Sequence, residues 1–258
     1  MTHDIVTALS GALVGLILAL VGGGGSIIAV PLLLYGAGMP SVHAAIGTSA
    51  VAVALSAFGN LLFAMRRSAI KWPCAIVFSV SGLLGTLAGS QLALSVNGEK
   101  LLTLFGGLML VIATVMLLRR DAEGDPEVRL TLQSARHMAP WIIASGAGVG
   151  FLAGFFGIGG GFLIVPALMV ATGMTITSAI ATSLVAITAF GTMTAVSYAY
   201  AGAVVWRDVG LFLLGGITGT ASGQTLASYV RERRALLQST FAVFVMAVGI
   251  YTLHRGLA

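Results

Sequence analysis

The chain has 258 residues, of which 58% are hydrophobic and only 8% are charged, and its formal net charge is +5. A soluble domain carries about a quarter charged residues, so the composition excludes an ordinary soluble protein and predicts a chain that lies mostly in lipid. The basic excess reflects loops that face anionic lipid headgroups and gives no sign of nucleic-acid binding. Cys74 is the only cysteine, which excludes an internal disulfide and a cysteine-rich metal site.

The charged residues form short clusters, and the predicted apolar segments are 18 to 35 residues long, against about 20 for one helical crossing. The N-terminus lacks a basic region and a clear cleavage site, so we interpret Ile5 onward as a membrane segment rather than a signal peptide. These runs predict an all-α integral membrane protein, a multi-pass helical bundle of 8–10 spans. In chain order the predicted apolar segments are 5–35, 44–65, 72–94, 101–118, 138–172, 178–201, 208–228 and 236–253.

The first segment contains VGGGGSIIAVP at residues 21–31. As one helix, segment 5–35 would be about 46 Å long at 1.5 Å per residue, which exceeds the hydrocarbon thickness of about 30 Å. Four successive glycines give the backbone the freedom to break the helix, and a proline is tolerated early in a new one. We therefore predict a helix that ends near Val21, an unwound glycine turn, and a shorter helix that starts near Ser26.

Such a break is a candidate anion site. Irregular backbone at membrane depth is tolerated only where protein or a water-filled cavity surrounds it, and a helix start presents free N–H groups to an anion. A nucleotide-binding loop is excluded because no lysine is nearby. Other glycines fit the small-residue spacing that lets membrane helices pack closely, and these are Gly82, Gly85, Gly89, Gly219 and Gly223.

The pattern occurs twice. FGIGGGFLIVP at 156–166 places Pro166 at an offset of 135 residues from Pro31. Further along the offset is 134, as the list of matched blocks shows: IGTSAVAV (46–53) with IATSLVAI (180–187), Trp72 with Trp206, and GTLAGSQL (85–92) with GTASGQTL (219–226). We predict two internal repeats, each with a broken helix at its glycine cluster, a common plan for secondary transporters. The predicted domains are transmembrane repeat 1 (1–118), a cytoplasmic linker (119–137) and transmembrane repeat 2 (138–258).

Polar side chains inside the predicted spans are candidates for lining a pathway. A single membrane serine or threonine commonly bonds its own helix backbone, but both repeats carry a Thr–Ser pair shortly after the broken helix, at 48–49 and 182–183. Asn60 and the two glutamines, Gln91 and Gln224, cannot bond to lipid, so we expect them to face protein or a cavity.

Charged residues are absent from the middle of every predicted span. Cation pumps usually place carboxylates there, and a membrane-embedded enzyme needs acid–base partners, so both classes are disfavoured. We expect no catalytic residue, no metal site and no cofactor. His43 has no counterpart in the other half; we interpret it as a loop or interfacial histidine, with proton coupling as the alternative. Trp72 and Trp206 are interpreted as interfacial anchors.

Several of these motifs resemble those of the sulfite exporter TauE/SafE family: GGGGSIIAVP and GIGGGFLIVP, the following TSAVAV and TSLVAI, and the G-T-x-x-G segments at 85–89 and 219–223. The resemblance covers nearly the whole chain. It implies a multi-pass inner-membrane permease for small sulfur-containing anions such as sulfite, sulfonates and thiosulfate. The second cluster departs from the first, with Ile158 among its glycines and Gly161 in place of Ser26, so the two half-sites are not chemically identical.

The predicted function is therefore a secondary transporter that moves a small sulfur anion by alternating access. The alternatives are a channel or carrier for another small solute, or a membrane-embedded subunit without transport of its own. The expected partners are the anion and the lipid bilayer, with no nucleic acid, and a homo-oligomer is left open. The predicted substrate-binding residues are Gly22, Gly23, Gly24, Gly25, Ser26, Thr48, Ser49, Gly157, Gly159, Gly160, Gly161, Thr182, Ser183, Gln91 and Gln224.

Three topologies are compatible with the sequence. Four crossings per repeat make the halves parallel and put nine of the thirteen Lys and Arg residues on the side of the linker. Five crossings make the halves inverted and put ten there, with both termini on the other side. A third option makes residues 26–36 re-entrant. The positive-inside rule places residues 119–136 in the cytoplasm in the first two, and we favour two breaks that enter from opposite sides and build one midplane site.

Overall fold

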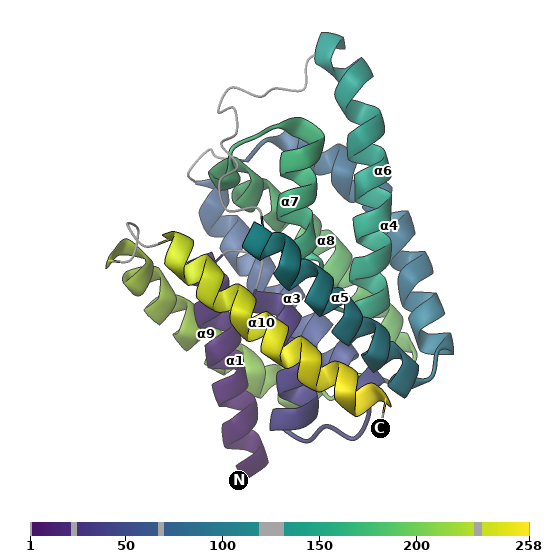
Figure 1. The fold of residues 1–258 in the computed structure, drawn as a ribbon, viewed down its shortest axis with the longest axis vertical. Coiled ribbons are helices and arrows are strands. Elements are labelled where there is room, and N and C mark those ends of the chain that lie inside the picture. The colour runs from purple at the N-terminus through teal and green to yellow at the C-terminus, as the bar shows by residue number, and fades with distance from the viewer. Residues whose placement is uncertain (1, 22–24, 67–69, 119–131, 230–233, 258) are drawn as a thin grey trace.

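A computed structural model describes residues 2–21, 25–66, 70–118, 132–229 and 234–257 of the chain. These residues form ten α-helices and one π-helical turn and include no strand element, which confirms the predicted all-α class (Figure 1). The elements are α1 (Thr2–Val21), α2 (Ser26–Pro31), η2 (Leu32–Gly36), α3 (Val42–Met65), α4 (Trp72–Ser95), α5 (Gly98–Leu118), α6 (Leu132–Phe156), α7 (Gly161–Thr172), α8 (Ile176–Tyr200), α9 (Trp206–Tyr229) and α10 (Arg234–Leu257).

Many of these helices are apolar enough for a membrane. Within the described residues, five are long and apolar enough to cross one, and they lie in α3, α4, α5, α6 and α8. Shorter apolar stretches lie in α1, α2 with η2, α7 and α10. Large apolar side chains cover the outer faces, for example Leu84, Leu214 and Ile217, which are 66–75% exposed. An outer face of this kind suits a lipid surround, and the total of 8–10 spans stays a prediction.

The helix boundaries follow the sequence signals closely. Helices α3, α4, α8 and α9 begin and end within two residues of their predicted segments. Pro73 lies in the first turn of α4, where its missing N–H costs no hydrogen bond, and Thr175 caps α8 by accepting the Ser178 N–H. Helix α6 differs, because it begins at Leu132, six residues before the predicted start and inside the predicted linker. Residues 132–137 contain no glycine or proline, so nothing in them stops a helix.

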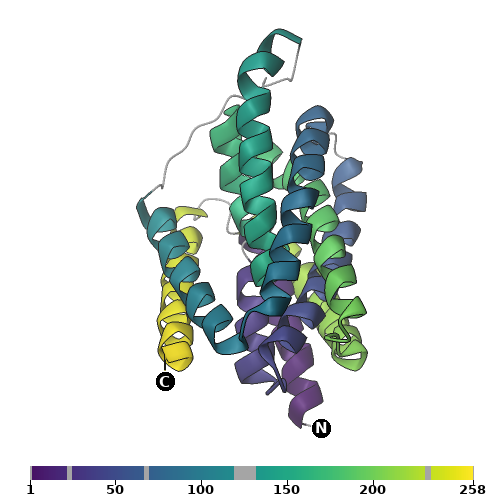
Figure 2. The ribbon, with the colours of Figure 1, turned by 90° about the vertical axis from the view of Figure 1, so that its right-hand side faces the viewer.

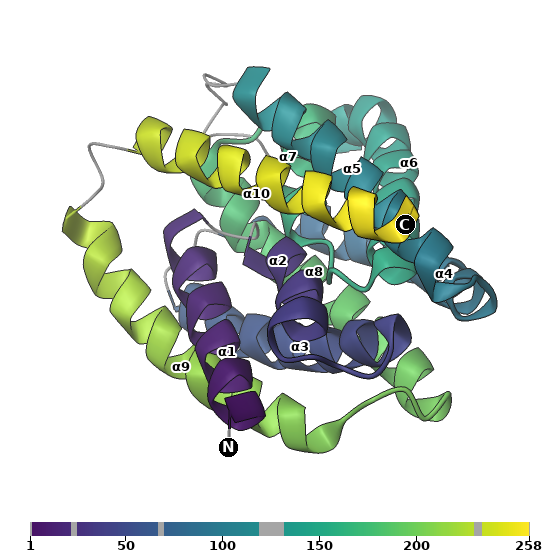
Figure 3. The ribbon, with the colours of Figure 1, turned by 60° about the horizontal axis from the view of Figure 1, so that its bottom comes forward.

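Two long helix pairs and one central pair hold the bundle together. Helix α1 packs along α9, α4 along α6, and α3 against α8, as the view in Figure 3 shows for α1 and α9. Helices α5 and α10 form a fourth pair at one side of the bundle (Figure 2). Glycines bring backbones into contact in the long pairs: a Cβ on Gly15 would overlap the backbone of Gly216, and one on Gly150 would overlap that of Gly82. Close backbone approach of this kind is how membrane helices associate without a hydrophobic driving force.

The contacts also fix the directions of the helices. Ala8 and Ala12 of α1 meet Gly215 and Gly219 of α9 in the same order, so α1 and α9 are parallel. The pair α4 and α6 is parallel as well, because Gly150 meets Gly82 and Gly154 meets Thr86. In contrast, α5 and α10 are antiparallel, since Gly106 meets Leu253 and Gly256 meets Thr103.

Helices α3 and α8 are antiparallel to each other. Thr48, near the start of α3, bonds Val205, which follows α8, and Thr182, near the start of α8, bonds Lys71, which follows α3. The described ends of α3, α5 and α9 consequently lie at one end of the bundle, and the two chain termini lie at the other (Figure 1). Of the three predicted topologies, the inverted one has this arrangement. The duplication itself stays a prediction, although these contacts recur at the offset of 134.

Candidate substrate site

The second glycine cluster forms a tight turn between two helices. Helix α6 ends at Phe156 and α7 begins at Gly161, and Gly157, Gly159 and Gly160 have φ angles of +65°, +62° and +72°. Side chains rarely adopt these angles, so glycine is required here. The helix break predicted for this segment is confirmed.

This turn is buried among the central helices. A Cβ on Gly157 would overlap Ile46 of α3, and one on Gly159 would lie 2.8 Å from Val53 of the same helix. The side chain of Ile158 is 1% exposed. The irregular backbone is thus surrounded by protein, as its depth in the bundle demands. The carbonyl of Gly160 accepts the N–H groups of Leu163 and Ile164 at 2.9 and 2.8 Å, which starts α7.

At the first cluster, Gly22, Gly23 and Gly24 lie outside the described residues. The flanking helices end at Val21 and begin at Ser26, where the sequence places the ends of the break. Gly25 lies against Val14 and Leu18 of α1, and Gly36, at the far end of η2, lies near Val6. Helix α2 and η2 therefore return along α1 in the opposite direction, as α7 does along α6.

The two Thr–Ser pairs use their hydroxyls in the same way. Thr48 Oγ1 accepts the backbone N–H of Val205 at 3.1 Å, and Thr182 Oγ1 accepts that of Lys71 at 3.1 Å. Val205 and Lys71 directly precede α9 and α4, so each threonine caps the start of a helix that belongs to the other half of the chain. The sequence predicted both threonines as substrate ligands and gave no hint of this capping.

The serines of these pairs bond to their own helices. Ser49 Oγ donates to the Ile46 carbonyl at 2.9 Å, and Ser183 Oγ donates to the Ile180 carbonyl at 2.8 Å. Both serines are at most 1% exposed. These bonds are the ordinary way in which a membrane helix satisfies a hydroxyl, so neither proton is free for a ligand in this conformation.

The predicted site residues do not all meet at one place. The turn at 157–160 lies against the part of α3 that carries Thr48 and Ser49. Thr182 and Ser183 lie at the opposite end of the bundle, because α3 and α8 are antiparallel. Gln91 is exposed one turn before the end of α4 rather than facing the core, and the Gln224 side chain lies outside the described residues.

His43 sits beside the end of α4. Its Nε2 is 3.1 Å from the Ala93 carbonyl, and its ring stacks on Tyr198 with the centroids 6.4 Å apart. The Nε2 atom must carry the hydrogen to donate to a carbonyl, which fixes the tautomer in this contact. The residue is half-buried and connects α3 to α4 and α8. It therefore packs between helices instead of lying in a loop, as the sequence had suggested.

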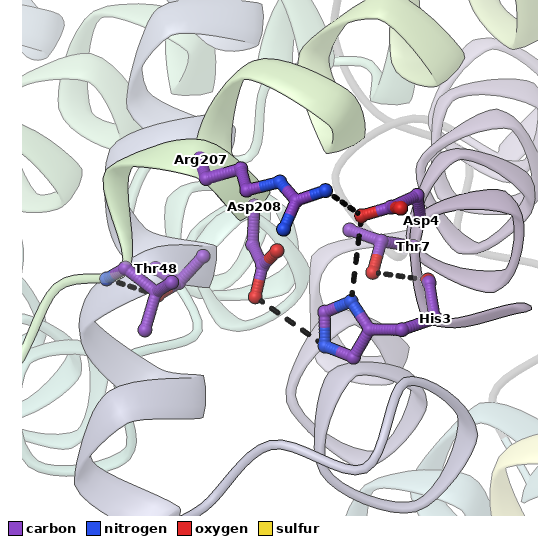
Figure 4. Close-up of polar contacts among 7 residues, drawn as sticks. His3, Asp4, Thr7, Thr48, Arg207 and Asp208 are labelled. Atoms are coloured by element: carbon purple, nitrogen blue, oxygen red, sulfur yellow. Dashed lines mark hydrogen bonds and ion pairs between the residues drawn. The ribbon is translucent and has the colours of Figure 1, made fainter. Parts of the chain in front are cut away.

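A polar cluster at the start of α9, which the sequence analysis missed, is shown in Figure 4. Arg207 Nη2 is 2.9 Å from Asp4 Oδ1, and His3 Nε2 is 3.7 Å from Asp208 Oδ2. Asp208 is 3% exposed and is the third residue of α9, where its negative charge favours the helix start. The sequence does contain a sign of this cluster: at the offset of 134 the residue that corresponds to Asp208 is the uncharged Cys74, so the two halves differ in charge at this position.

Asp208 is also the only buried charged side chain among the described residues. The core around the turn at 157–160 therefore offers backbone amides and hydroxyl groups instead of ions. Such donors can hold a small anion without a full counter-charge, and they leave it free to depart.

Comparisons with known proteins agree with this description. Residues 7–252 match the family model described as "Sulfite exporter TauE/SafE". The chain is 43% identical over 255 residues to a "Probable membrane transporter protein" of Xylella fastidiosa strain Temecula1, covering 98% of this chain and 96% of the relative. A probable membrane transporter protein of Bacillus subtilis strain 168 is 25% identical over 261 residues, covering 95% and 93%. No solved structure matches the chain.

Proposed function

Because the chain belongs to the sulfite exporter TauE/SafE family, we propose that it is a secondary transporter that moves a small sulfur-containing anion across the inner membrane by alternating access. The family and the names of its relatives indicate a membrane transporter rather than an enzyme. The proposed cargo is sulfite, thiosulfate or a small sulfonate. The proposed partners are this anion and the lipid bilayer.

The observation that carries the proposal is the buried helix break at residues 157–160. A turn with three positive-φ glycines starts α7 inside the protein, in a core whose described residues include one buried charge, Asp208, at its edge. Glycine lets a ligand approach the backbone closely, and a helix start carries partial positive charge. A site of this kind suits an oxyanion better than a cation, which would need carboxylates.

We assign the proposed binding groups by the kind of donor that each supplies. The glycine clusters supply backbone N–H donors, and Ser26 supplies a hydroxyl. The Thr–Ser pairs at 48–49 and 182–183 are assigned as further hydroxyl ligands. In this conformation the threonines accept backbone N–H groups that precede α9 and α4, and the serines donate to their own helices, so these bonds have to break before the hydroxyls can bind the anion. Gln91 and Gln224 are assigned to the approach to the site.

The charge distribution supports an orientation. Ten of the thirteen Lys and Arg residues lie at 66–71, 119–136 and 231–234, segments that join helix ends at one end of the bundle. By the positive-inside rule that end, with the linker, faces the cytoplasm. Both termini then lie on the outer side of the membrane.

The test is flux through purified protein in proteoliposomes, with sulfite, thiosulfate, ethanesulfonate and chloride compared. Saturable flux of one sulfur anion is expected. Flux that rises linearly with concentration would indicate a channel, and no flux of any sulfur anion would overturn the proposed cargo.

A matched pair of variants tests the turn itself. Gly160→Ala and Gly173→Ala both place a side chain at a positive φ, +72° and +73°. A Cβ at 160 would meet Ala153 at 2.9 Å, whereas one at 173 would have no described atom within 4 Å. Gly160→Ala should reduce flux at least about tenfold, an effect of about 1.4 kcal/mol, while Gly173→Ala retains it. Equal flux in the two variants would remove the turn from the site.

A further inference from the structure

A small cavity lies between α1, α3 and α9, beside the start of α2. Its volume is about 10 Å³, which is room for roughly one water molecule. The hydroxyl-bearing residues Ser26 and Ser56 line it, and the rest of the lining is apolar or glycine. Ser26 is 1% exposed, and Ser56 is half-buried.

The corresponding place in the second half has almost the same walls. The offsets of 135 and 134 map the cavity glycines Gly11, Gly15 and Gly216 onto Gly146, Gly150 and Gly82, and they map Phe212 onto Phe78. Two positions differ in polarity. Gly161 stands for Ser26, and Phe190 stands for Ser56, so both hydroxyls belong to one half.

In the second half an aromatic ring occupies this place. Phe190 stacks on Phe78 with the ring centroids 6.0 Å apart, and a Cβ added to Gly82 would overlap the Phe190 ring. In the first half, a Cβ added to Gly216 would still lie 3.9 Å from Ser56 Oγ. The exchange of Phe for Ser thus leaves space on one side of the molecule and fills it on the other.

The Ser56 hydroxyl also differs from those of Ser49, Ser81 and Ser183, whereas the Ser79 hydroxyl, which is buried away from this cavity, likewise has no hydrogen-bond partner among the described residues. Ser49, Ser81 and Ser183 donate to carbonyls of their own helices at 2.8–3.0 Å. Ser56 forms no hydrogen bond to another described residue. A half-buried hydroxyl that faces a cavity and does not bond a carbonyl of its own helix can donate to a ligand.

We propose that the Ser26–Ser56 cavity is a second subsite for the anion, in addition to the turn at 157–160, and that Ser56 donates to an oxygen of the bound anion. The second half of the chain has no equivalent of this cavity, because Phe190 fills it. This inference rests on the proposed transport of a small oxyanion. At about 10 Å³ the cavity has room for roughly one water molecule and is too small for a sulfur oxyanion, so α2 has to move away from α1 before the anion can enter. Helices α1 and α9 stay together, because their contact is backbone against backbone.

The first test is kinetic. Ser56→Ala removes the donor at nearly constant volume, and the loss of a hydrogen bond to a charged ligand should raise KM about 10- to 100-fold. Ser56→Thr keeps the hydroxyl and should stay within about threefold of the wild type. The control is Ser222→Ala, an exposed serine of α9 that bonds the Thr218 carbonyl at 2.8 Å, and its KM should not change. An unchanged KM in Ser56→Ala would overturn the proposal.

The second test does not depend on flux. In a Cys74→Ala background, Ser56→Cys should react with the anionic reagent 2-sulfonatoethyl methanethiosulfonate, and ethanesulfonate should slow the reaction at least about fivefold. Ser79→Cys, at a 6% exposed position on α4, is the control and should stay unreactive. Equal labelling at the two positions, or labelling that no anion slows, would overturn the subsite.

The two experiments separate the subsite from the function on which it rests. A wild type without flux of any sulfur anion means that the proposed function fails, and protection of Ser56→Cys by ethanesulfonate then decides the subsite alone. Wild-type flux with an unlabelled Ser56→Cys leaves the function standing and removes the subsite.

Discussion

The starts of α4 and α9 are alike in their backbone and unlike in their charge. Each helix begins with a tryptophan, and the N–H of the residue before it bonds to a threonine near the start of a central helix from the other half. At α9 the polar cluster of Asp4, Arg207, His3 and Asp208 lies beside this contact. At α4 the corresponding positions hold Pro73 and Cys74, a residue without charge and a buried thiol.

The difference separates what holds the architecture from what distinguishes the two ends. The threonine caps and the glycine contacts occur at both ends, so they fix how the helices are joined. The polar cluster occurs at the end that carries both termini, which is the outer end in the proposed orientation. We infer that the contact between α1 and α9 at this end is stronger than the corresponding contact between α6 and α4.

The largest expected effect tests the shared architecture. Gly219→Leu in α9 and Gly85→Leu in α4 would each drive a side chain into a facing carbonyl, that of Ala12 or Ala147. Both should destabilise the fold by about 3 kcal/mol, at the upper end of overpacking costs, and lower the apparent Tm in detergent by several degrees. Gly210→Leu is the control, since no atom of the described structure lies within 4 Å of its added Cβ. If only one of the two leucine variants lost much stability, the glycine contacts of α4 and α9 would not be equivalent.

The threonine caps come next. Thr48→Val and Thr182→Val each leave a helix-start N–H without its acceptor, which should cost about 1–2 kcal/mol. Thr→Ser at either position keeps the acceptor and should recover most of the loss in a thermal unfolding measurement. If valine were as stable as serine at both positions, the caps would contribute nothing to stability.

Asp208 should distinguish the two ends. Asp208→Asn keeps the shape but removes the charge at the start of α9, and about 1 kcal/mol of stability should be lost. Combined with Thr48→Val, at the same helix start, the losses should deviate from additivity by more than about 0.5 kcal/mol. Combined with Thr182→Val, at the other end, they should add. Additivity in both double variants would mean that the cluster and the cap act independently.

The smallest effect is expected for Arg207. Its side chain is 75% exposed in the pair with Asp4, and exposed pairs contribute about 0.2–1 kcal/mol. Arg207→Ala should therefore lower the apparent Tm only slightly, and the difference from the wild type should shrink in high salt. A salt-independent loss would point to packing by the arginine stem instead of its charge.

Much of the fold was predictable because membrane helices are encoded locally. The ends of α3, α4, α8 and α9 follow from the length of an apolar run. The break at Gly157–Gly160 follows from a glycine cluster inside an apolar segment that is too long for one crossing. The early start of α6 at Leu132 was missed, because a helix that extends beyond its apolar run leaves no mark in hydropathy.

The site was less predictable, for a reason that Thr48 illustrates. The sequence shows a hydroxyl in a span, but its partner is the Val205 N–H, 157 residues away. The same holds for Ser56, which nothing in the sequence singles out. The structure places it opposite Gly216 and places its counterpart Phe190 against Gly82. Chemistry can be read from one residue, whereas a ligand role depends on whether a neighbour already uses the group.

The sequence by itself determined the membrane class, the helix breaks and the matched blocks at offsets of 135 and 134, because each depends on hydropathy, backbone freedom or identity along the chain. Only the tertiary structure decided the antiparallel course of α3 and α8, the capping of α4 and α9 by threonines of the opposite half, and the space beside Ser56. These depend on which helices meet, and helix pairing in lipid is governed by the fit of small residues across an interface. A single chain shows those residues but not the partner against which they pack.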